Sequence, residues 1–257
     1  MADPLHQFKI EKIIDLPDVT LPGLGTVDLA ITNSHVAMTV AFAAIVLFLT
    51  AVTSNAQVVP GRLQTVGEGV FGLIDNLTDS IIGHEGRKLF PFVFTVFTLI
   101  LGMNFLGLML AFTATSQIAV TATFGLLTIG LVLIIGFAKH GLGFFKLFVP
   151  SGVPWVLLPV IVPIEFASFL LRPVTLTLRL FGNMMGGHVA LKVFAGFVAV
   201  AVAGQIGLLG IPVGIASISM LTALTALEFL VAFLQAFVFA VLTCIYLNDV
   251  VNLGHGH

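Results

Sequence analysis

Apolar residues run through this sequence in five stretches, each long enough to cross a membrane as a helix. A helix needs roughly 20 apolar residues to span the hydrocarbon core of a bilayer. The stretches cover residues 35–54, 89–112, 118–138, 158–203 and 206–248. A membrane barrel would instead show short strands of alternating apolar and polar residues. The pattern therefore predicts an all-α integral membrane protein, in which residues 1–257 form a single membrane domain with five membrane segments.

The fourth and fifth stretches are longer than a single crossing requires. As one helix, residues 163–203 would be roughly 60 Å long, about twice the hydrocarbon thickness. Such a helix must lie strongly tilted, or bend near Pro173 or in the glycine-rich segment that follows it. The segment AGQIGLLGIP, residues 203–212, supplies a turn. We expect residues 158–249 to form a long tilted helical hairpin that presents a shallow surface to another molecule.

The connections between the stretches also carry a pattern. Residues 61–83 place leucine, isoleucine and valine at helical spacing and Glu68, Asp75 and Asp79 on another face, which predicts an interfacial amphipathic helix on the cytoplasmic membrane surface. Its acidic face is either the solvated side of a connector or a docking site for a partner. The short TATS segment, residues 113–116, predicts a tight hairpin between the second and third stretches, and residues 139–154 predict a loop.

Composition and charge agree with a membrane protein and indicate its orientation. The chain is 58% hydrophobic and 9% charged, against roughly 25% charged residues in a soluble domain. Basic residues concentrate in the two loops that follow the first and third stretches, so the positive-inside rule predicts an outer N-terminus and a cytoplasmic C-terminus. Residues 1–34, which would lie outside, are too acidic for a targeting peptide. Cys244, the single cysteine, is expected to be a small core residue.

Ionisable residues follow one face of the fourth stretch. Glu165, Arg172 and Arg179 are spaced seven residues apart, so at 100° per residue they fall within a stripe about 40° wide. Asn183 lies near the same face, among glycines that allow another helix to approach closely. One face of this helix is therefore predicted to be polar.

His188 and Lys192 lie on the opposite side of the same stretch, and Glu228 lies in the fifth. A charge near the bilayer centre costs at least about 2.5 kcal/mol, so such residues are candidates for function. Each one alone could equally be structural: an arginine satisfied by a carboxylate, a histidine satisfied in the core, or a lysine reaching for the membrane surface. Together they favour ion translocation.

The polar residues of the two stretches share one register. If the hairpin folds about a turn near Gly207, residue numbers that pair across it sum to about 414. This register places Arg179 opposite Gln235, His188 opposite Glu228, and Glu165 opposite Asp249. The polar groups are therefore predicted to be partners at graded depths along a path through the membrane.

Two segments carry a resemblance to a known family. They are PVTLTLRLFGNMMGGH, residues 173–188, and FLQAFVFAVLTCIYL, residues 233–247, with a weaker match in GMNFLGLML, residues 102–110. They resemble the a subunits of F-type ATP synthases, over residues 35–248 of this chain. One departure is Met109, where the family often has proline. Some members carry an acid at the position of His188 and a histidine at that of Glu228, so the two types are exchanged here.

The resemblance implies roles for several residues. Arg179 would be the essential charge that faces a ring of c subunits, with Asn183 beside it and Gln235 holding its guanidinium. Protons would enter an outer half-channel at His188 and Glu228. An inner half-channel would contain Glu165 and Ser168, with Asp249 at its mouth. Arginine stays charged and relays no protons, so Arg179 would favour ionisation of a ring carboxylate and obstruct leakage between the channels.

The resemblance also implies a setting. The chain would lie in a bacterial inner membrane, with the c ring, b-type peripheral stalk subunits and the remaining ATP synthase subunits as partners. No cofactor, metal or nucleic acid is expected. No G-x-x-x-x-G-K phosphate-binding loop occurs, so nucleotide chemistry would belong to other subunits and the chain would be no enzyme on its own. The alternative is a secondary cation/proton antiporter, although the inverted repeats of many such proteins are not found here.

Overall fold

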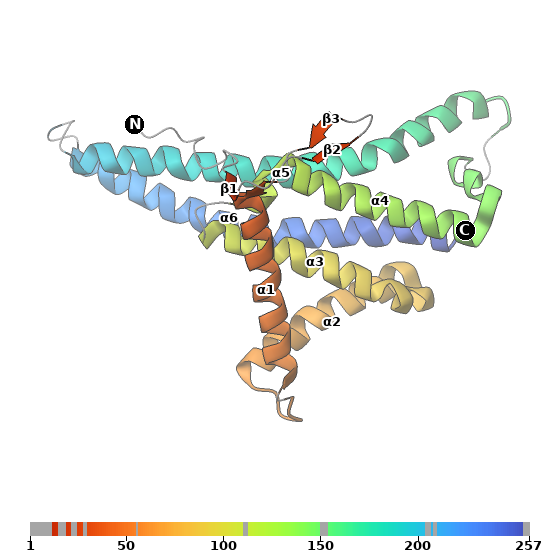
Figure 1. The fold of residues 1–257 in the computed structure, drawn as a ribbon, viewed down its shortest axis with the longest axis horizontal. Helices are drawn as coiled ribbons and strands as arrows, with labels where there is room; N and C mark the ends of the chain where they lie inside the picture. Colours follow the sequence, from red (N-terminus) through yellow and green to blue (C-terminus); the bar gives the residue numbers. More distant parts are fainter. Residues whose placement is uncertain are drawn as a thin grey trace.

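The computed structural model describes residues 12–14, 19–21, 25–27, 30–54, 56–109, 113–149, 154–203, 207 and 210–253. Helices dominate these residues (Figure 1). The long helices are α1 (Asn33–Ser54), α2 (Arg62–Ile82), α3 (Gly86–Met109), α4 (Ile118–His140), α5 (Leu158–Val202) and α6 (Gly210–Val251). Shorter 3₁₀ helices are η2 (Gly83–Glu85), η3 (Ala114–Ser116) and η4 (Gly141–Phe148).

Five helices are long and apolar enough to cross a membrane: α1, α3, α4 together with η4, α5 and α6. They correspond in order to the five predicted stretches, so the predicted all-α membrane fold is confirmed. Two glycines end helices where the chain needs a left-handed backbone: Gly83 after α2 has a φ of 75° and Gly141 after α4 has a φ of 54°. Glycine adopts such angles without the steric cost that a side chain adds.

The amphipathic segment forms α2, as predicted. Its apolar side packs toward α3 and α6, with Ile74 and Thr78 buried, while Glu68, Asp75 and Asp79 are exposed on the other side. The acidic face is therefore free of cover from the described part of this chain.

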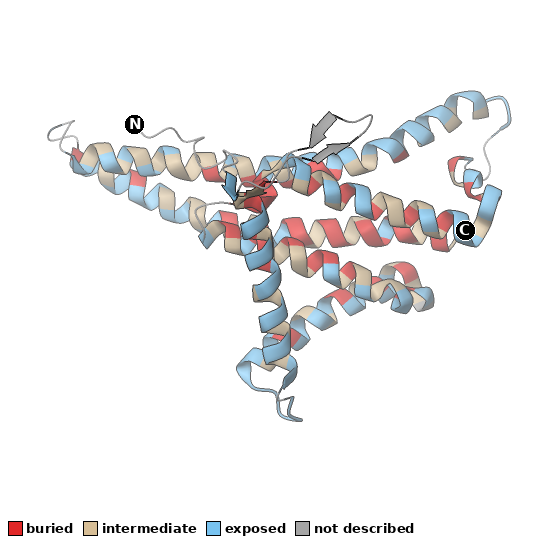
Figure 2. Cartoon of the chain, in the orientation of Figure 1, coloured by how far each residue is buried: buried red, intermediate tan, exposed pale blue. Residues whose placement is uncertain are grey.

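Helix α6 lies at the centre of the bundle and contacts α2, α3, α4 and α5. Figure 2 shows buried residues concentrated along its C-terminal half and on the neighbouring helices. Phe239, Leu247 and Val250 are fully buried there, and so is Cys244, which confirms the prediction of a core cysteine. Helix α1 packs against α3 and α2, but only 6% of its membrane-spanning stretch is buried.

Helix α5 continues without a break through Pro163 and Pro173. In Figure 1 it descends from its N-terminal end at the upper right and then runs level to the far left, so it changes direction along its length. Helix α6 returns antiparallel beneath it, and the two pack closely. The predicted turn lies between them: α5 ends at Val202 and α6 begins at Gly210. Residues 204–206 and 208–209 of that turn lie outside the described residues.

The predicted loop over residues 139–154 is only partly correct. Helix α4 extends to His140, and η4 occupies residues 141–148. The reason is aromatic packing: the ring centroids of Phe144 and Phe148 lie 6.2 and 5.6 Å from that of Phe169 on α5. Burying these rings offsets the helix-weakening effect of the glycines. Residues 150–153 lie outside the described residues.

Short strands were not predicted in the N-terminal segment. Strand β1 (Lys12–Ile14) pairs antiparallel with β4 (Ile31–Thr32), and β2 (Val19–Leu21) pairs antiparallel with β3 (Gly25–Val27). These segments contain valine, isoleucine and threonine, whose branched side chains favour strands. They are too short to change the fold class.

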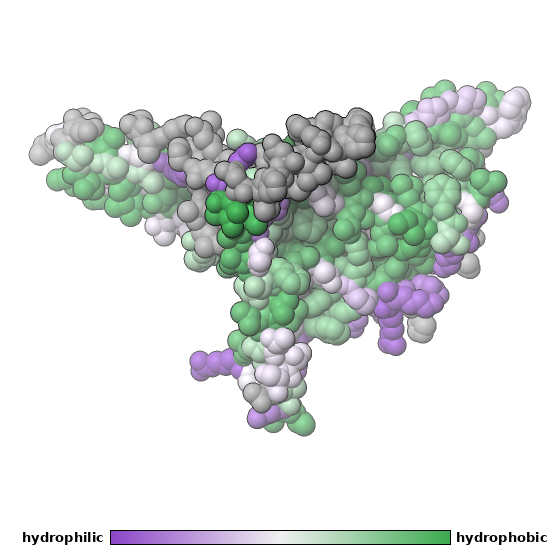
Figure 3. Space-filling model, in the orientation of Figure 1, coloured by the Kyte–Doolittle hydropathy of each residue, from purple (hydrophilic) through white to green (hydrophobic). Residues whose placement is uncertain are grey.

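Hydrophobic residues cover most of the described surface that Figure 3 shows, and hydrophilic residues gather near the ends of the helices. A band of this kind suits a bilayer, in which apolar side chains face lipid and charged ones reach the headgroups.

Candidate functional site

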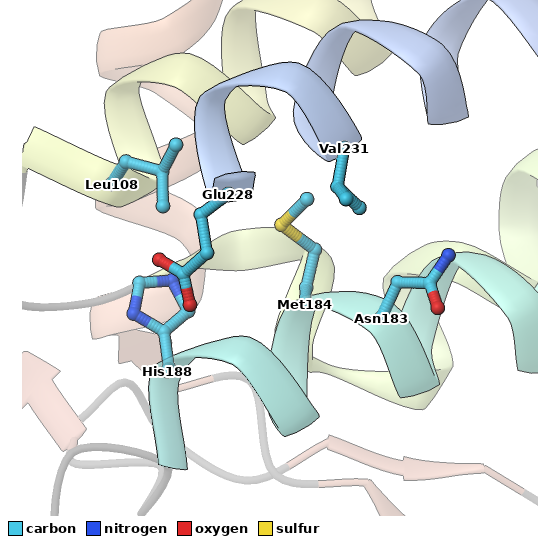
Figure 4. Close-up of a pocket in the computed structure, with 6 residues that line it drawn as sticks. All are labelled: Leu108, Asn183, Met184, His188, Glu228 and Val231. Carbon is cyan, nitrogen blue, oxygen red and sulfur yellow. The ribbon is translucent and has the colours of Figure 1, made fainter. Parts of the chain in front are cut away.

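His188 of α5 and Glu228 of α6 meet at a small pocket between the two helices (Figure 4). Each of the two residues is only 9% exposed. The lining is completed by Leu108, Asn183, Met184 and Val231. The free space is about that of a single water molecule. The structure thus brings together the histidine and the acid that the register placed opposite each other.

The carboxylate of Glu228 lies directly against the backbone of α5. A Cβ atom added at Gly187 would overlap its Oε1 atom, so only glycine at this position leaves room for the acid. Both oxygens of Glu228 are buried, and neither has a hydrogen-bond partner within the described residues. A buried carboxyl group without partners is costly unless it takes up a proton or binds water. Proton binding is therefore chemistry that this site favours.

His188 is held by a residue that sequence reasoning missed. Its Nε2 atom lies 2.8 Å from the Thr113 hydroxyl, which belongs to the connection between α3 and α4. Thr113 is also buried. Its only sequence signal was its place in the polar TATS segment, which by itself predicts a turn and nothing more.

Asn183 and Gln235 form the next polar level. The Asn183 side-chain amide donates a hydrogen bond of 2.9 Å to the Gln235 carbonyl oxygen. The predicted bond from the Arg179 guanidinium to Gln235 is not among the hydrogen bonds of the described residues, in which Gln235 bonds to Asn183. The buried amide nitrogen of Gln235 has no hydrogen-bond partner among the described residues. The Gln235 carbonyl oxygen keeps a second lone pair, so its bond to the Arg179 guanidinium stays a prediction.

Arg179 lies on the exposed side of α5. Within the part of the chain that the structure describes, it has no salt bridge to a carboxylate. Its charge acts on Tyr246 of α6, which lies within electrostatic reach of both Arg172 and Arg179. A permanent charge on an apolar helix is costly in a membrane unless it is paired or solvated.

Arg172 differs from Arg179, although both belong to the predicted polar stripe. Its Nη1 atom lies 2.9 Å from Oδ2 of Asp249 on α6, and its guanidinium lies 4.8 Å from the Tyr246 ring centroid and 5.7 Å from that of Phe169. The register had paired Asp249 with Glu165, seven residues away from Arg172. That pairing is wrong because Arg172 takes the carboxylate. Tyr246, the only tyrosine of the chain, is a second residue that sequence reasoning missed.

The remaining predicted residues lie toward the N-terminal end of α5. Glu165 is half-buried and Ser168 is exposed. They precede Arg172 and Arg179 along the same helix, so the described residues place an acid and a hydroxyl on one side of the arginines and the His188–Glu228 pocket on the other.

The fold and this hairpin define a multi-pass helical membrane protein that carries ionisable residues at several depths. Residues 35–248 match the family model described as ATP synthase A chain. The chain is similar to ATP synthase subunit a of Allorhizobium ampelinum, with 49% identity over 99% of both chains, and to that of Rhizobium etli strain CIAT 652, with the same identity and coverage. It is 48% identical to ATP synthase subunit a of Rhodopseudomonas palustris strain BisA53, over 99% of this chain and 100% of that protein.

The chain therefore belongs to the ATP synthase A chain family, as the resemblance predicted. It is a component of an ATP synthase, and its partners are other subunits of that complex. None of these matches favours the antiporter alternative.

Proposed function

We propose that this chain is the proton-translocating stator subunit of an F-type ATP synthase, and that it couples proton flow to rotation of a c ring. The observation that carries the proposal is Arg179, an exposed charge on the least covered side of a long apolar helix, with no carboxylate partner among the described residues. A ring of c subunits that carries carboxylates in the membrane would supply the missing partner.

The two sides of Arg179 would serve as two offset half-channels. His188, Glu228 and Asn183 line one pocket and form the outer half-channel, where a histidine suits a proton relay because it exchanges protons near neutral pH. Glu165 and Ser168 lie beyond Arg172 and form the inner half-channel, with Asp249 at its mouth. Protons would reach and leave the ring carboxylate on opposite sides of the arginine.

Arg179 would act through its charge alone. Guanidinium holds its proton at any physiological pH, so it relays none. Its field favours the ionised form of a carboxylate that approaches it, so a proton arriving on the ring is released to the inner side. Its fixed charge also opposes direct passage of protons between the half-channels. Asn183 lies on the same exposed side of α5 and donates a hydrogen bond to the buried Gln235.

The proposal includes a setting for the chain. It would lie in a bacterial inner membrane, with residues 1–34 outside, α2 on the cytoplasmic surface and the C-terminus inside, as the distribution of basic residues supports. Its direct partners would be the c ring and b-type peripheral stalk subunits. It would have no catalysis of its own, because no phosphate-binding loop occurs in the sequence.

The Arg179→Ala variant tests this proposal in the assembled complex. We expect it to abolish ATP-driven proton pumping and proton-driven ATP synthesis while the subunit still assembles, because the residue is exposed and bonds to no carboxylate among the described residues. Arg179→Lys is the finer variant, since lysine can lose its proton when it is desolvated. Normal coupled ATP synthesis in Arg179→Ala would remove this residue from the mechanism.

Single cysteines at positions 165 and 188, in a Cys244→Ser background, test the two half-channels. We expect impermeant thiol reagents to reach Glu165→Cys from the cytoplasmic side and His188→Cys from the opposite side, since the two positions lie on either side of Arg179. As the control, reagent added first from the expected side should protect that cysteine from later labelling. Labelling of both positions from one face would reject the offset arrangement.

A further inference from the structure

Residues 113–116, the described part of the connection between α3 and α4 that includes η3, are buried, which is unusual for a connecting segment. Thr113 is 3% exposed, Thr115 is fully buried and Ser116 is 4% exposed. Connections usually run over the surface, because a buried one must find partners for its polar groups. This one packs among α1, α3, α4 and α5. Its polar side chains therefore face the interior of the bundle at the level of His188.

The Thr113 hydroxyl makes two contacts, and only one of them can use its hydrogen. It donates to the Gly107 carbonyl oxygen at 3.0 Å. Gly107 lies in the last turn of α3, where carbonyl groups have no partner within the helix. The second contact is the one of 2.8 Å to Nε2 of His188. A hydroxyl has a single hydrogen, so in this second contact the imidazole donates and the threonine oxygen accepts.

We infer that Thr113 is a positioning residue for the proton relay: it keeps a hydrogen on Nε2 of His188 and leaves proton exchange to Nδ1. This inference rests on the proposed role of His188. In the relay, the lone pair of Nδ1 takes up a proton and gives an imidazolium, and the same nitrogen then releases that proton to the Glu228 carboxylate or to water. The neutral imidazole is restored with its Nε2 hydrogen in place.

Two further contacts hold Thr113 where this requires it. A Cβ atom added at Gly107 would lie 2.8 Å from the Thr113 Oγ1 atom and would overlap its methyl group, so the hydroxyl reaches the α3 backbone only because residue 107 is glycine. The Ser116 hydroxyl donates to the Thr113 carbonyl oxygen at 2.6 Å. Gly107 belongs to the GMNFLGLML segment, and this close approach gives the segment a physical role.

The test compares Thr113→Val with Thr113→Ser in the complete ATP synthase in vesicles. Valine keeps the shape and loses the hydroxyl, whereas serine keeps the hydroxyl. We expect Thr113→Val to lower proton-driven ATP synthesis about two- to tenfold, the range that corresponds to one net hydrogen bond, and Thr113→Ser to stay close to wild type. Gly107→Ala, which displaces the hydroxyl without removing it, should resemble Thr113→Val.

Solid-state ¹⁵N NMR of the histidines supplies a readout that mere packing would not change. The signal of His188 is identified by its loss in His188→Gln. We expect hydrogen on Nε2 in the wild type and in Thr113→Ser, and a gain of the form with hydrogen on Nδ1 in Thr113→Val. A wild-type spectrum with hydrogen on Nδ1 and none on Nε2 would overturn the inference, even if Thr113→Val failed to assemble. So would Thr113→Val with full activity and an unchanged spectrum.

The same set of variants separates this inference from the proposed function. If His188→Gln keeps full proton-driven synthesis, the relay itself fails, whatever the spectrum shows. If His188→Gln is impaired while Thr113→Val matches wild type in both readouts, the relay stands and only the role of Thr113 fails.

Discussion

Helices α5 and α6 are alike in length and apolar character and differ in their surroundings. They have 45 and 42 residues, and both are strongly apolar. Yet only 6% of the membrane-spanning stretch of α5 is buried, against 50% of that of α6. Hydrophobicity does not produce this difference, because lipid is as apolar as a helix interface. The difference lies in contacts: α6 is surrounded by α2, α3, α4 and α5, whereas one side of α5 is exposed in the part of the chain that the structure describes.

The polar residues divide in the same way. Helix α6 contributes Glu228 and Gln235, both buried, while α5 contributes Arg179 and Asn183 on its exposed side and, as the exception, the buried His188. Helix α6 is therefore held in the interior of the bundle, and α5 presents a surface to another molecule. We expect substitutions at buried positions of α6 to change stability, and substitutions on the exposed side of α5 to change coupling.

The largest contrast in stability is expected between Phe239→Ala in α6 and Leu171→Ala in α5. Phe239 is fully buried and Leu171 is 57% exposed. Removing a buried phenylalanine side chain costs about 3 to 5 kcal/mol, whereas an exposed substitution usually changes stability by less than about 0.5 kcal/mol. The two variants are compared by heating the solubilised complex and measuring how much of this subunit remains in it. Equal losses would show that burial in α6 does not govern stability.

A smaller effect is expected at the ion pair that joins the two helices. Arg172→Ala removes a charge-assisted contact to Asp249, which should cost about 1.5 to 3 kcal/mol; the lower end is the better guide, since both side chains are about a quarter to a third exposed. Arg87→Ala, at an exposed arginine of α3, is the control and should be near neutral. If both variants unfold at the same temperature, the pair contributes nothing to holding α5 on α6.

The finest test exchanges the pair across the pocket, as His188→Glu with Glu228→His. Each single change leaves two groups of one type side by side, while the exchange restores an acid and a histidine. A double-mutant cycle on proton-driven synthesis should show an interaction energy of about 0.5 to 3 kcal/mol, as for groups in contact. Additive losses, without recovery in the exchanged protein, would mean that His188 and Glu228 act separately.

The spans and the hairpin were predictable because a bilayer demands long apolar helices, and the hydropathy of α1, α3, α4, α5 and α6 meets that demand. The meeting of His188 with Glu228 followed from antiparallel geometry near the turn. Farther away the register fails: from Gly187 to Arg172 is fifteen residues of α5, while from Glu228 to Asp249 is twenty-one of α6. A constant register requires two straight antiparallel helices, and α5 changes direction along its length.

Thr113 and Tyr246 could not be predicted by that reasoning. Their roles depend on which helix lies beside which, and the pattern of a single segment contains no such information. Likewise, the partner of Gln235 depends on how the hairpin faces are turned. Arg172 and Arg179 have the same spacing and chemistry in the sequence, and only the position of Asp249 tells them apart.

The buried connection at Thr113 also has a consequence for the order in which the chain folds. The bond from Thr113 to Gly107 spans six residues, and the contact with His188 spans 75. A ribosome delivers α3 and α4 before α5, and short loops close faster than long ones. The α3–α4 hairpin can therefore form its Thr113–Gly107 hydrogen bond first. The Thr113 oxygen is then already in position when His188 arrives, and it accepts the hydrogen bond from the imidazole.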